Sequence, residues 1–348
     1  MDSKQTVLIT GGAGYVGARL VPRLLSEGYR VKVLDLYLFD DDALASVKGN
    51  PDLEEIKGDI CDQELLKRVL PGCDSVIHLA CISNDPCFEL NPDLSRVINY
   101  EAFRPLVQIS KESGIKRFIY ASTSSVYGVS DSPRVDETHP LLPITDYNKY
   151  KGMCEPILFE YQSENFTTVA IRPATVCGYS PRQRLDLTVN ILTNFAVNKG
   201  KITIFGGTQM RPNIHIEDMV DLYVLLLKIE ANKIAGQSFN AGYENHTVKD
   251  LALMVKSVVE RRLPNREEVN LITEHSEDVR SYRITSDKIK NQLGFAPKRT
   301  IEDAVNDLVD AFEKGLLPNS FEDVKYFNIK AMQTKNPFGS VKSPVASR

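Results

Sequence analysis

The feature that most restricts the fold is a glycine-rich turn between an apolar stretch and an amphipathic stretch near the N-terminus. Residues 6–10, TVLIT, have the character of a buried strand and run directly into GGAGYVG at 11–17. In such a turn Gly11 permits the tight bend, Gly14 lets the backbone approach a phosphate, and Gly17 lets the following helix pack on the strand. The start of that helix offers unpaired N–H groups to phosphates. The pattern predicts a dinucleotide site.

Short apolar runs alternate with amphipathic stretches through the first half of the chain, which is typical of a parallel sheet covered by helices on both faces. The expected strands are Thr6–Thr10, Arg30–Asp35, Leu53–Lys57, Ser75–Leu79, Arg117–Ala121 and Thr167–Arg172. The expected helices lie at about Tyr15–Glu27, Asp62–Val69, Leu94–Ser113 and Tyr147–Glu164. The fold class is therefore α/β, with a doubly wound parallel sheet.

A chain of 348 residues is long enough for two lobes. We expect a dinucleotide-binding domain over residues 1–180, to which later segments around 212–245 return, and a smaller C-terminal α/β substrate lobe over residues 181–328. Residues 329–348 are rich in Lys, Ser, Asn and Pro, so a loosely held tail is expected there.

Composition argues against several classes of partner. A formal net charge of -4 and the lack of a basic stripe give no reason to expect nucleic acid. No apolar run approaches the ~20 residues that span a bilayer, and the polar start favours a cytoplasmic protein without a membrane partner. The six cysteines show no paired spacing, so we expect reduced thiols and no metal site.

The residue at the end of the second expected strand is Asp35. A carboxylate at this place can accept hydrogen bonds from the adenosine ribose hydroxyls and would repel a 2′-phosphate. No Arg or Lys follows in residues 36–39, so the sequence favours NAD over NADP. A solvated aspartate in a turn is the alternative.

Two further segments carry candidate reactive groups. Tyr147 and Lys151 have the spacing that places them on one face of a helix, where an ammonium favours the phenolate and makes tyrosine a usable base. The fifth expected strand ends in STSSVYG at 122–128, whose hydroxyls can hydrogen-bond a substrate oxygen as it becomes a carbonyl. The alternative for Tyr147 and Lys151 is an exposed pair on a helix. The alternative for residues 122–128 is a turn whose hydroxyls hydrogen-bond only its own backbone.

Together these segments resemble the extended short-chain dehydrogenase/reductase family, in particular its branch of nucleotide-sugar epimerases and dehydratases. The similarity extends over roughly Thr6 to Pro297. Its landmarks are TGGAGYVG at 10–17, Asp35, GDI at 58–60, HLA at 78–80, Asn99, STSSVYG at 122–128, Tyr147 with Lys151, Arg172-Pro173 and RPNIHIED at 211–218. The resemblance implies a Rossmann domain, bound NAD and a nucleotide-diphosphate sugar as substrate.

The resemblance also implies roles for individual residues. Tyr147 is similar to the family's base, Lys151 to the residue that lowers its pKa and holds the nicotinamide ribose, and Thr123 to the hydroxyl that orients the substrate. The implied NAD contacts are Gly11, Gly14, Tyr15, Val16, Asp35, Leu36, Asp59, Ile60, Leu79, Ala80, Asn99, Ser122, Tyr147, Lys151 and Pro173. The implied substrate contacts are Asn190, at the start of the substrate lobe, and Arg211 and Arg280, whose guanidinium groups suit a diphosphate unless they are structural. The family's usual pairing through two helices, here about Leu94–Ser113 and Tyr147–Glu164, implies a homodimer.

Departures from the family pattern narrow the reaction. In the 4,6-dehydratases an Asp-Glu pair follows the catalytic threonine, whereas this chain has Ser124-Ser125, which argues against dehydration. The usual YxxSK is YNKYK, and Pro173-Ala174-Thr175 stands where many epimerases have Tyr-Phe-Asn. Residues 180–190 resemble a bacterial sub-branch that includes oxidoreductases acting at C4 of nucleotide-linked sugars.

The resemblance implies reversible oxidation at C4 of a nucleotide sugar, with hydride passing to NAD. An epimerase would return the hydride to the other face of the keto-sugar, whereas a dehydrogenase or reductase would release the keto-sugar. A protein that senses NAD without catalysis is an alternative of another class, because fold alone does not establish activity. The sequence favours epimerisation and leaves the nucleotide and the sugar open.

Overall fold

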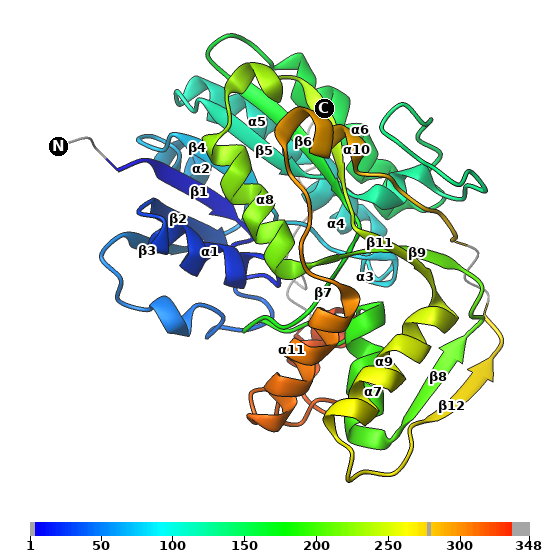
Figure 1. The fold of residues 1–348 in the computed structure, drawn as a ribbon. Coiled ribbons are helices and arrows are strands. Elements are labelled where there is room, and N and C mark those ends of the chain that lie inside the picture. The colour runs from blue at the N-terminus through cyan, green and yellow to red at the C-terminus, as the bar shows by residue number, and fades with distance from the viewer. Residues whose placement is uncertain (1–3, 277–279, 336–348) are drawn as a thin grey trace.

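The computed structural model describes residues 4–276 and 280–335, and a sheet of parallel strands forms its centre (Figure 1). The strand order is β10-β6-β5-β4-β1-β2-β3. These strands are β1 (Thr6–Thr10), β2 (Arg30–Asp35), β3 (Leu53–Lys57), β4 (Ser75–His78), β5 (Arg117–Ala121), β6 (Thr167–Pro173) and β10 (Gln237–Ala241). The winding reverses beside β1, which pairs with β2 on one side and with β4 on the other. The predicted doubly wound Rossmann sheet is confirmed, and ligands bind such sheets outside the carboxyl ends of the strands at this reversal.

Helices cover both faces of the sheet. One face carries α1 (Gly17–Ser26), α8 (Ile216–Lys228) and α10 (Asp287–Leu293), and the other carries α2 (Gln63–Val69), α5 (Phe103–Glu112) and α6 (Asp146–Glu160). In α1 the apolar residues Leu20, Val21 and Leu24 recur at helical spacing and are fully buried. All of β1 is buried because the sheet is covered on both faces, so the strand is a continuous apolar run.

The second lobe, which is expected from the sequence to bind substrate, packs three helices around a separate apolar core, below the sheet in the view of Figure 1. These helices are α7 (Thr188–Lys199), α9 (Val248–Arg262) and α11 (Ile301–Glu313). The strands β8 (Lys201–Phe205) and β12 (Asn270–Glu274) pair in parallel at the edge of this lobe. A small sheet of β11 (Glu244–Thr247), β9 (Met210–His215) and β7 (Thr175–Cys177) joins the lobe to the Rossmann domain.

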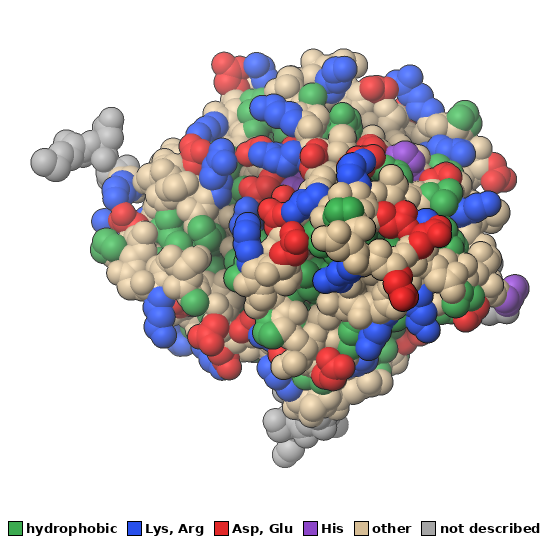
Figure 2. All heavy atoms as spheres, turned by 60° about the horizontal axis from the view of Figure 1, so that its bottom comes forward, with side chains coloured by type: hydrophobic (Ala, Val, Ile, Leu, Met, Phe, Trp, Pro, Cys, Tyr) green, Lys and Arg blue, Asp and Glu red, His purple; other side chains and the backbone are tan. Residues whose placement is uncertain are grey.

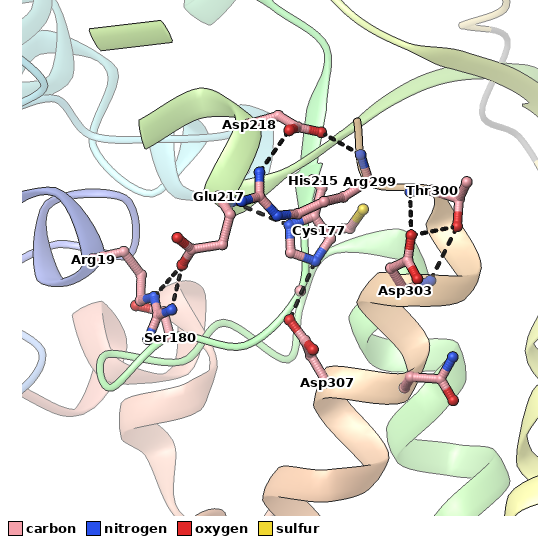
Figure 3. Close-up of polar contacts among 12 residues, drawn as sticks. Arg19, Cys177, Ser180, His215, Glu217, Asp218, Arg299, Thr300, Asp303 and Asp307 are labelled. Carbon is pink, nitrogen blue, oxygen red and sulfur yellow. Dashed lines mark hydrogen bonds and ion pairs between the residues drawn. The ribbon is translucent and has the colours of Figure 1, made fainter. Parts of the chain in front are cut away.

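Polar contacts fix α11 of the lobe against the start of α8 (Figure 3). The Asp218 carboxylate accepts hydrogen bonds from the Arg299 backbone at 2.9 Å and from its guanidinium at 2.7 Å. Nε2 of the buried His215 lies 3.3 Å from a carboxylate oxygen of Asp307. The two lobes are therefore joined by directional contacts as well as by apolar packing.

The expected helix Leu94–Ser113 is divided in the structure. It consists of α4 (Pro92–Arg96), the π-helical turn η2 (Val97–Glu101) and α5. The wider turn places Asn99 so that its side-chain amide accepts from the backbone N–H of Ile82 at 2.8 Å and donates to the Ile82 carbonyl at 2.9 Å. A single π-turn within a longer helical segment is typical of functional regions, and periodicity alone does not predict it.

Two C-terminal segments differ from the expected division. Ile284, Ile289 and Phe295 lie in the core beneath the Rossmann sheet, although their segment was expected in the substrate lobe. The loosely held tail expected from residue 329 is wrong for its first part, because residues 328–335 form helix α12 (Asn328–Lys335), anchored by the buried Met332. The rest of that tail, residues 336–348, lies outside the described residues.

The surface agrees with the nearly balanced composition. On the face that Figure 2 shows, Lys and Arg side chains are interspersed with Asp and Glu side chains. Among the helices of residues 4–276 and 280–335, none combines the length and the apolar content that crossing a membrane requires.

Candidate active site

A cavity of about 530 Å³ lies at the carboxyl ends of the central strands, a size typical of ligand sites. It brings together residues predicted from several separate motifs. The predicted residues in its wall are Gly11, Gly14, Tyr15, Val16, Asp35, Leu36, Asp59, Ile60, Leu79, Ala80, Ser122, Thr123, Tyr147, Pro173, Arg211 and Arg280. One wall, which we call the sheet wall, is formed by the ends of β1, β2, β4 and β5. The opposite part, which we call the cover, consists of residues 178–187, residues 280–282 and helix α12.

The glycine-rich turn forms a cradle that side chains would fill. Gly11 has a φ of +76°, and a Cβ there would lie 2.6 Å from the backbone nitrogen of Ala80. A Cβ on Gly17 would lie 2.3 Å from the carbonyl oxygen of Gly12. The predicted tight turn and close helix packing therefore hold. The bare backbone beside the start of α1 fits the diphosphate of a dinucleotide.

Asp35 lies at the end of β2, where a ribose-binding carboxylate is expected. Its two oxygens accept hydrogen bonds from the backbone N–H groups of Ala13 and Tyr37, each at 2.9 Å. Burial raises the pKa of Asp35, and these N–H groups oppose that shift. The carboxylate is thus tied to the glycine-rich turn and also faces the cavity.

The candidate reactive groups converge from β5 and α6. Tyr147 lies in the first turn of α6, and Thr123 follows β5; both side chains line the cavity. The Thr123 hydroxyl lies 2.7 Å from that of Ser125, which in turn donates to Asn148. Lys151 is buried one turn after Tyr147, where its ammonium donates to the Ala121 carbonyl and lies 4.5 Å from the centre of the Tyr120 ring.

Charged neighbours act on Tyr147 in opposite directions. Burial raises the pKa of its phenol well above the ordinary value, and electrostatic interactions with Cys81 and Asp85 add to this effect. The Arg184 cation and a hydrogen bond from the Asn84 backbone lower the pKa. Without further positive charge nearby, the phenol is therefore protonated at neutral pH.

Three predicted site residues lie behind the cavity wall. Lys151 supports the end of β5, and Asn99 supports the turn after β4 through Ile82. Asn190 accepts a hydrogen bond from the backbone N–H of Gly178 at 3.1 Å and donates to the Tyr15 hydroxyl, also at 3.1 Å. In the structure these side chains hold the segments that form the wall.

The predicted diphosphate arginines come from two segments that meet at the cover. The Arg211 guanidinium donates to the Arg280 carbonyl, and the Arg280 guanidinium pairs with Asp85. Nearby, the Tyr282 hydroxyl lies 3.2 Å from that of Ser124. Asp85 and Tyr282 carry no sequence signal of their own, because their positions depend on how distant loops fold together.

A buried ion pair supports the sheet wall from beneath. Glu155 of α6 accepts three hydrogen bonds from the Arg172 guanidinium, at 2.7, 3.0 and 3.2 Å, and one from the Ser122 hydroxyl at 2.6 Å. Although burial works against its charge, the Glu155 carboxylate raises the pKa of Arg172. Arg172 was expected only as a family landmark, and Glu155 lies in no motif that the sequence offers.

The charged side chains of residues 180–187 are further members of the site that were not predicted from the sequence. Arg184 is paired with Asp186 at 2.9 Å, and both line the cavity. Asn84 lines it as well, with a φ of +75° that is rare outside glycine. Such backbone strain is concentrated at functional sites. The repeated arginines of this segment are visible in the sequence. Without the fold, however, they did not indicate whether their side chains face the cavity.

The parallel sheet, the glycine cradle and Asp35 define a dinucleotide-binding protein of the Rossmann class. Residues 7–242 match the model of the NAD dependent epimerase/dehydratase family, and the chain belongs to this family. Its cofactor is NAD, and the cradle and Asp35 are the residues that fit it.

Relatives differ in the reaction that they carry out. The chain is 30% identical over 275 residues to a UDP-glucose 4-epimerase of Lactobacillus helveticus, covering 72% of this chain and 82% of the relative. It is 27% identical over 320 residues to a dTDP-glucose 4,6-dehydratase of Streptomyces griseus, covering 88% and 94%. The solved UDP-glucose 4-epimerase of Thermotoga maritima with UDP-glucose matches with a TM-score of 0.78 at 26% identity, covering 90% and 100%. These relatives place the chain among nucleotide-sugar enzymes without resolving its reaction.

Proposed function

We propose that this protein is an NAD-dependent nucleotide-sugar epimerase that acts by transient oxidation at C4 of its substrate. The observation that carries the proposal is the convergence of Tyr147 and Thr123 on the cavity that contains the glycine cradle. When bound, NAD supplies the hydride acceptor and a positive ring. The roles of the individual residues in the reaction are part of the proposal.

In the proposed reaction Tyr147 accepts the proton of the C4 hydroxyl while hydride leaves C4, so that the sugar becomes a 4-ketone. The positive charge brought by the cofactor lowers the pKa of Tyr147, against the effect of burial, and Lys151 holds the end of β5 in place. The Thr123 hydroxyl donates to the oxygen as it becomes a carbonyl. Return of hydride and proton after rotation of the sugar gives the epimer.

The side chains after Thr123 favour epimerisation over dehydration. Ser124 and Ser125 have neutral hydroxyls, bonded to Tyr282 and Asn148, where dehydratases carry an acidic pair. Loss of water from a 4-ketosugar needs a base and an acid at C5 and C6. The Asp85 carboxylate is already paired with Arg280.

A net C4 dehydrogenase or reductase is the second candidate, favoured by the resemblance of residues 180–190 to C4 oxidoreductases. The test is to identify the nucleotide released on denaturing the purified protein, and then to follow UDP-, GDP-, CDP- and dTDP-sugars by NMR. Bound NAD and an inverted C4 centre without added oxidant would support the epimerase. A 4-keto product with accumulating NADH would favour the dehydrogenase, and full catalysis by a variant without the Tyr147 hydroxyl would refute the mechanism.

The active protein is proposed to be a homodimer that pairs through the outer faces of α5 and α6. Residues on these helices include Arg104 and Glu160, which form a surface ion pair at 2.7 Å. A molar mass of one chain by light scattering would refute the dimer.

A further inference from the structure

The buried guanidinium of Arg182 is the least satisfied charged group of the cover. Its side chain is 2% exposed. Nη2 donates to the Asn328 side chain, and the guanidinium carbon lies 4.2 Å from the centre of the Phe39 ring. Nε and Nη1 have no hydrogen-bond partner. A buried cation with two unmet N–H groups is costly, so a partner that completes it is expected.

The carboxylates around Arg182 are already engaged. Asp186 is bonded to Arg184 and to the backbone N–H of Asn328, and Asp35 is bonded to the glycine-rich turn and to Tyr37. Burial and the Arg184 cation lower the pKa of Arg182 to about 9. The charge of Arg182 is therefore only partly compensated, and the cavity that it lines is open to an additional acceptor with negative charge.

Arg182 lies beside the adenosine half of the cofactor region. It lines the same cavity as Gly14 and Asp35, and Ser180 of the same loop donates to the Tyr15 carbonyl at 2.7 Å. Gly14 and Tyr15 belong to the turn expected to face the diphosphate. An oxygen of that diphosphate has the negative charge and the acceptor capacity that the Arg182 guanidinium lacks in its surroundings.

Helix α12 covers the same end of the cavity. Asn328 and Met332 line the cavity, and Met332 is buried in the core that contains Leu34 and Ile60 at the ends of β2 and β3. Lys335 donates to the Leu38 carbonyl at 2.6 Å. The helix is thus attached to the strand ends where the adenosine is expected, and through Asn328 to Arg182.

We propose that Arg182 and α12 form a clasp over the adenosine-diphosphate half of NAD, in which the guanidinium donates to a diphosphate oxygen and Met332 covers the adenosine. The consequence is slow release of NAD. Slow release suits an enzyme that restores its cofactor in every cycle, so this consequence deepens the proposed epimerase function and rests on it. The clasp itself rests only on the contacts described and on NAD as the cofactor.

The test measures release of NAD from the intact holoprotein, without any sugar, by exchange against isotopically labelled NAD. Arg182→Gln is expected to release NAD roughly 10- to 100-fold faster, because a hydrogen bond to a charged group contributes roughly 1.5–3 kcal/mol. Met332→Ala is expected to release it several-fold faster. Arg261→Gln, which changes an exposed arginine outside both the cavity and the proposed dimer faces, serves as the matched control and should leave the rate unchanged.

A folded Arg182→Gln variant with the wild-type release rate would overturn the clasp. Should that variant fail to fold, Met332→Ala and Lys335→Ala decide the question in the same way: faster release supports the clasp, and the wild-type rate refutes it. Because no sugar is present, these outcomes are independent of the reaction. A failure of the epimerase proposal would appear only in the product analysis.

Discussion

The sheet wall and the cover of the cavity are built by different means. The sheet wall uses backbone and glycine geometry, with Gly11 and Gly17 where a Cβ would collide with neighbouring backbone. The cover uses charged side chains from distant segments, such as Arg182, Arg184 and Arg280. The first construction specifies that NAD is bound. We propose that the second governs substrate binding, the electrostatics of Tyr147 and the release of the cofactor.

The largest expected effect concerns Tyr147, which lines the cavity between the sheet wall and the cover. Tyr147→Phe removes the proposed base but leaves the glycine cradle and Asp35 intact. We expect kcat to fall by about 10³-fold, within the range for removing a general base, while NAD stays bound. Turnover and cofactor content, measured on the same preparation, check this. Loss of NAD together with activity would mean that Tyr147 belongs to cofactor binding rather than to the chemistry.

A large effect on stability is expected beneath the sheet wall. Glu155→Gln leaves the Arg172 guanidinium buried without its carboxylate, and breaking a buried pair costs roughly 3–5 kcal/mol. Urea unfolding measures this change in the free energy of unfolding. The control is Glu64→Gln, which removes an exposed partner of Lys67 and should leave the unfolding midpoint unchanged. Equal stability of the two variants would show that the network does not support the wall.

A smaller effect concerns pH and His78. Burial, together with the Lys151 cation, lowers the pKa of His78 to about 3. Because protonation then favours the unfolded chain, stability is lost as pH falls from about 6.5 towards 3, by about 1.4 kcal/mol per pH unit from this group. Between pH 6.5 and 5 the wild type should lose about 2 kcal/mol more than His78→Gln in urea unfolding. Parallel pH profiles for the two proteins would contradict this assignment.

The smallest expected effect belongs to the cover. Arg184→Gln removes the cation that lowers the pKa of Tyr147, so the rise of kcat/KM with pH should move to more alkaline pH. Activity near neutrality falls and recovers at higher pH, whereas Arg184→Lys keeps the charge and much of the profile. A uniform loss at all pH values would assign Arg184 to substrate binding instead.

The sheet wall and the cover also differ in how far the sequence predicts them. Gly11, Asp35 and Tyr147 lie within local motifs, in which residue spacing corresponds directly to geometry on a strand end or a helix face. The strands of the Rossmann domain were predicted for the same reason, since their apolar runs are local. Fold class and cofactor were therefore accessible from the sequence.

The site residues and the helix that were not predicted from the sequence depend on contacts between distant segments. Arg182 meets Asn328 only after the chain returns to the adenosine end, and Asp85 meets Arg280 only after the substrate lobe closes on the Rossmann domain. Composition predicted a loosely held tail where α12 forms. The few apolar residues of this helix, including Met332, stabilise it only by packing against the sheet core. Tertiary packing, rather than local propensity, determines these parts.

The central claim is that hydride leaves C4 of the sugar and returns to the same carbon. The most direct measurement uses the nucleotide sugar that turns over in the panel, carrying deuterium at C4, with the holoenzyme and no added oxidant. We predict an epimer that retains deuterium at its inverted C4 centre, without release of deuterated NADH. Loss of the label from C4, or its accumulation in free cofactor, would contradict the account.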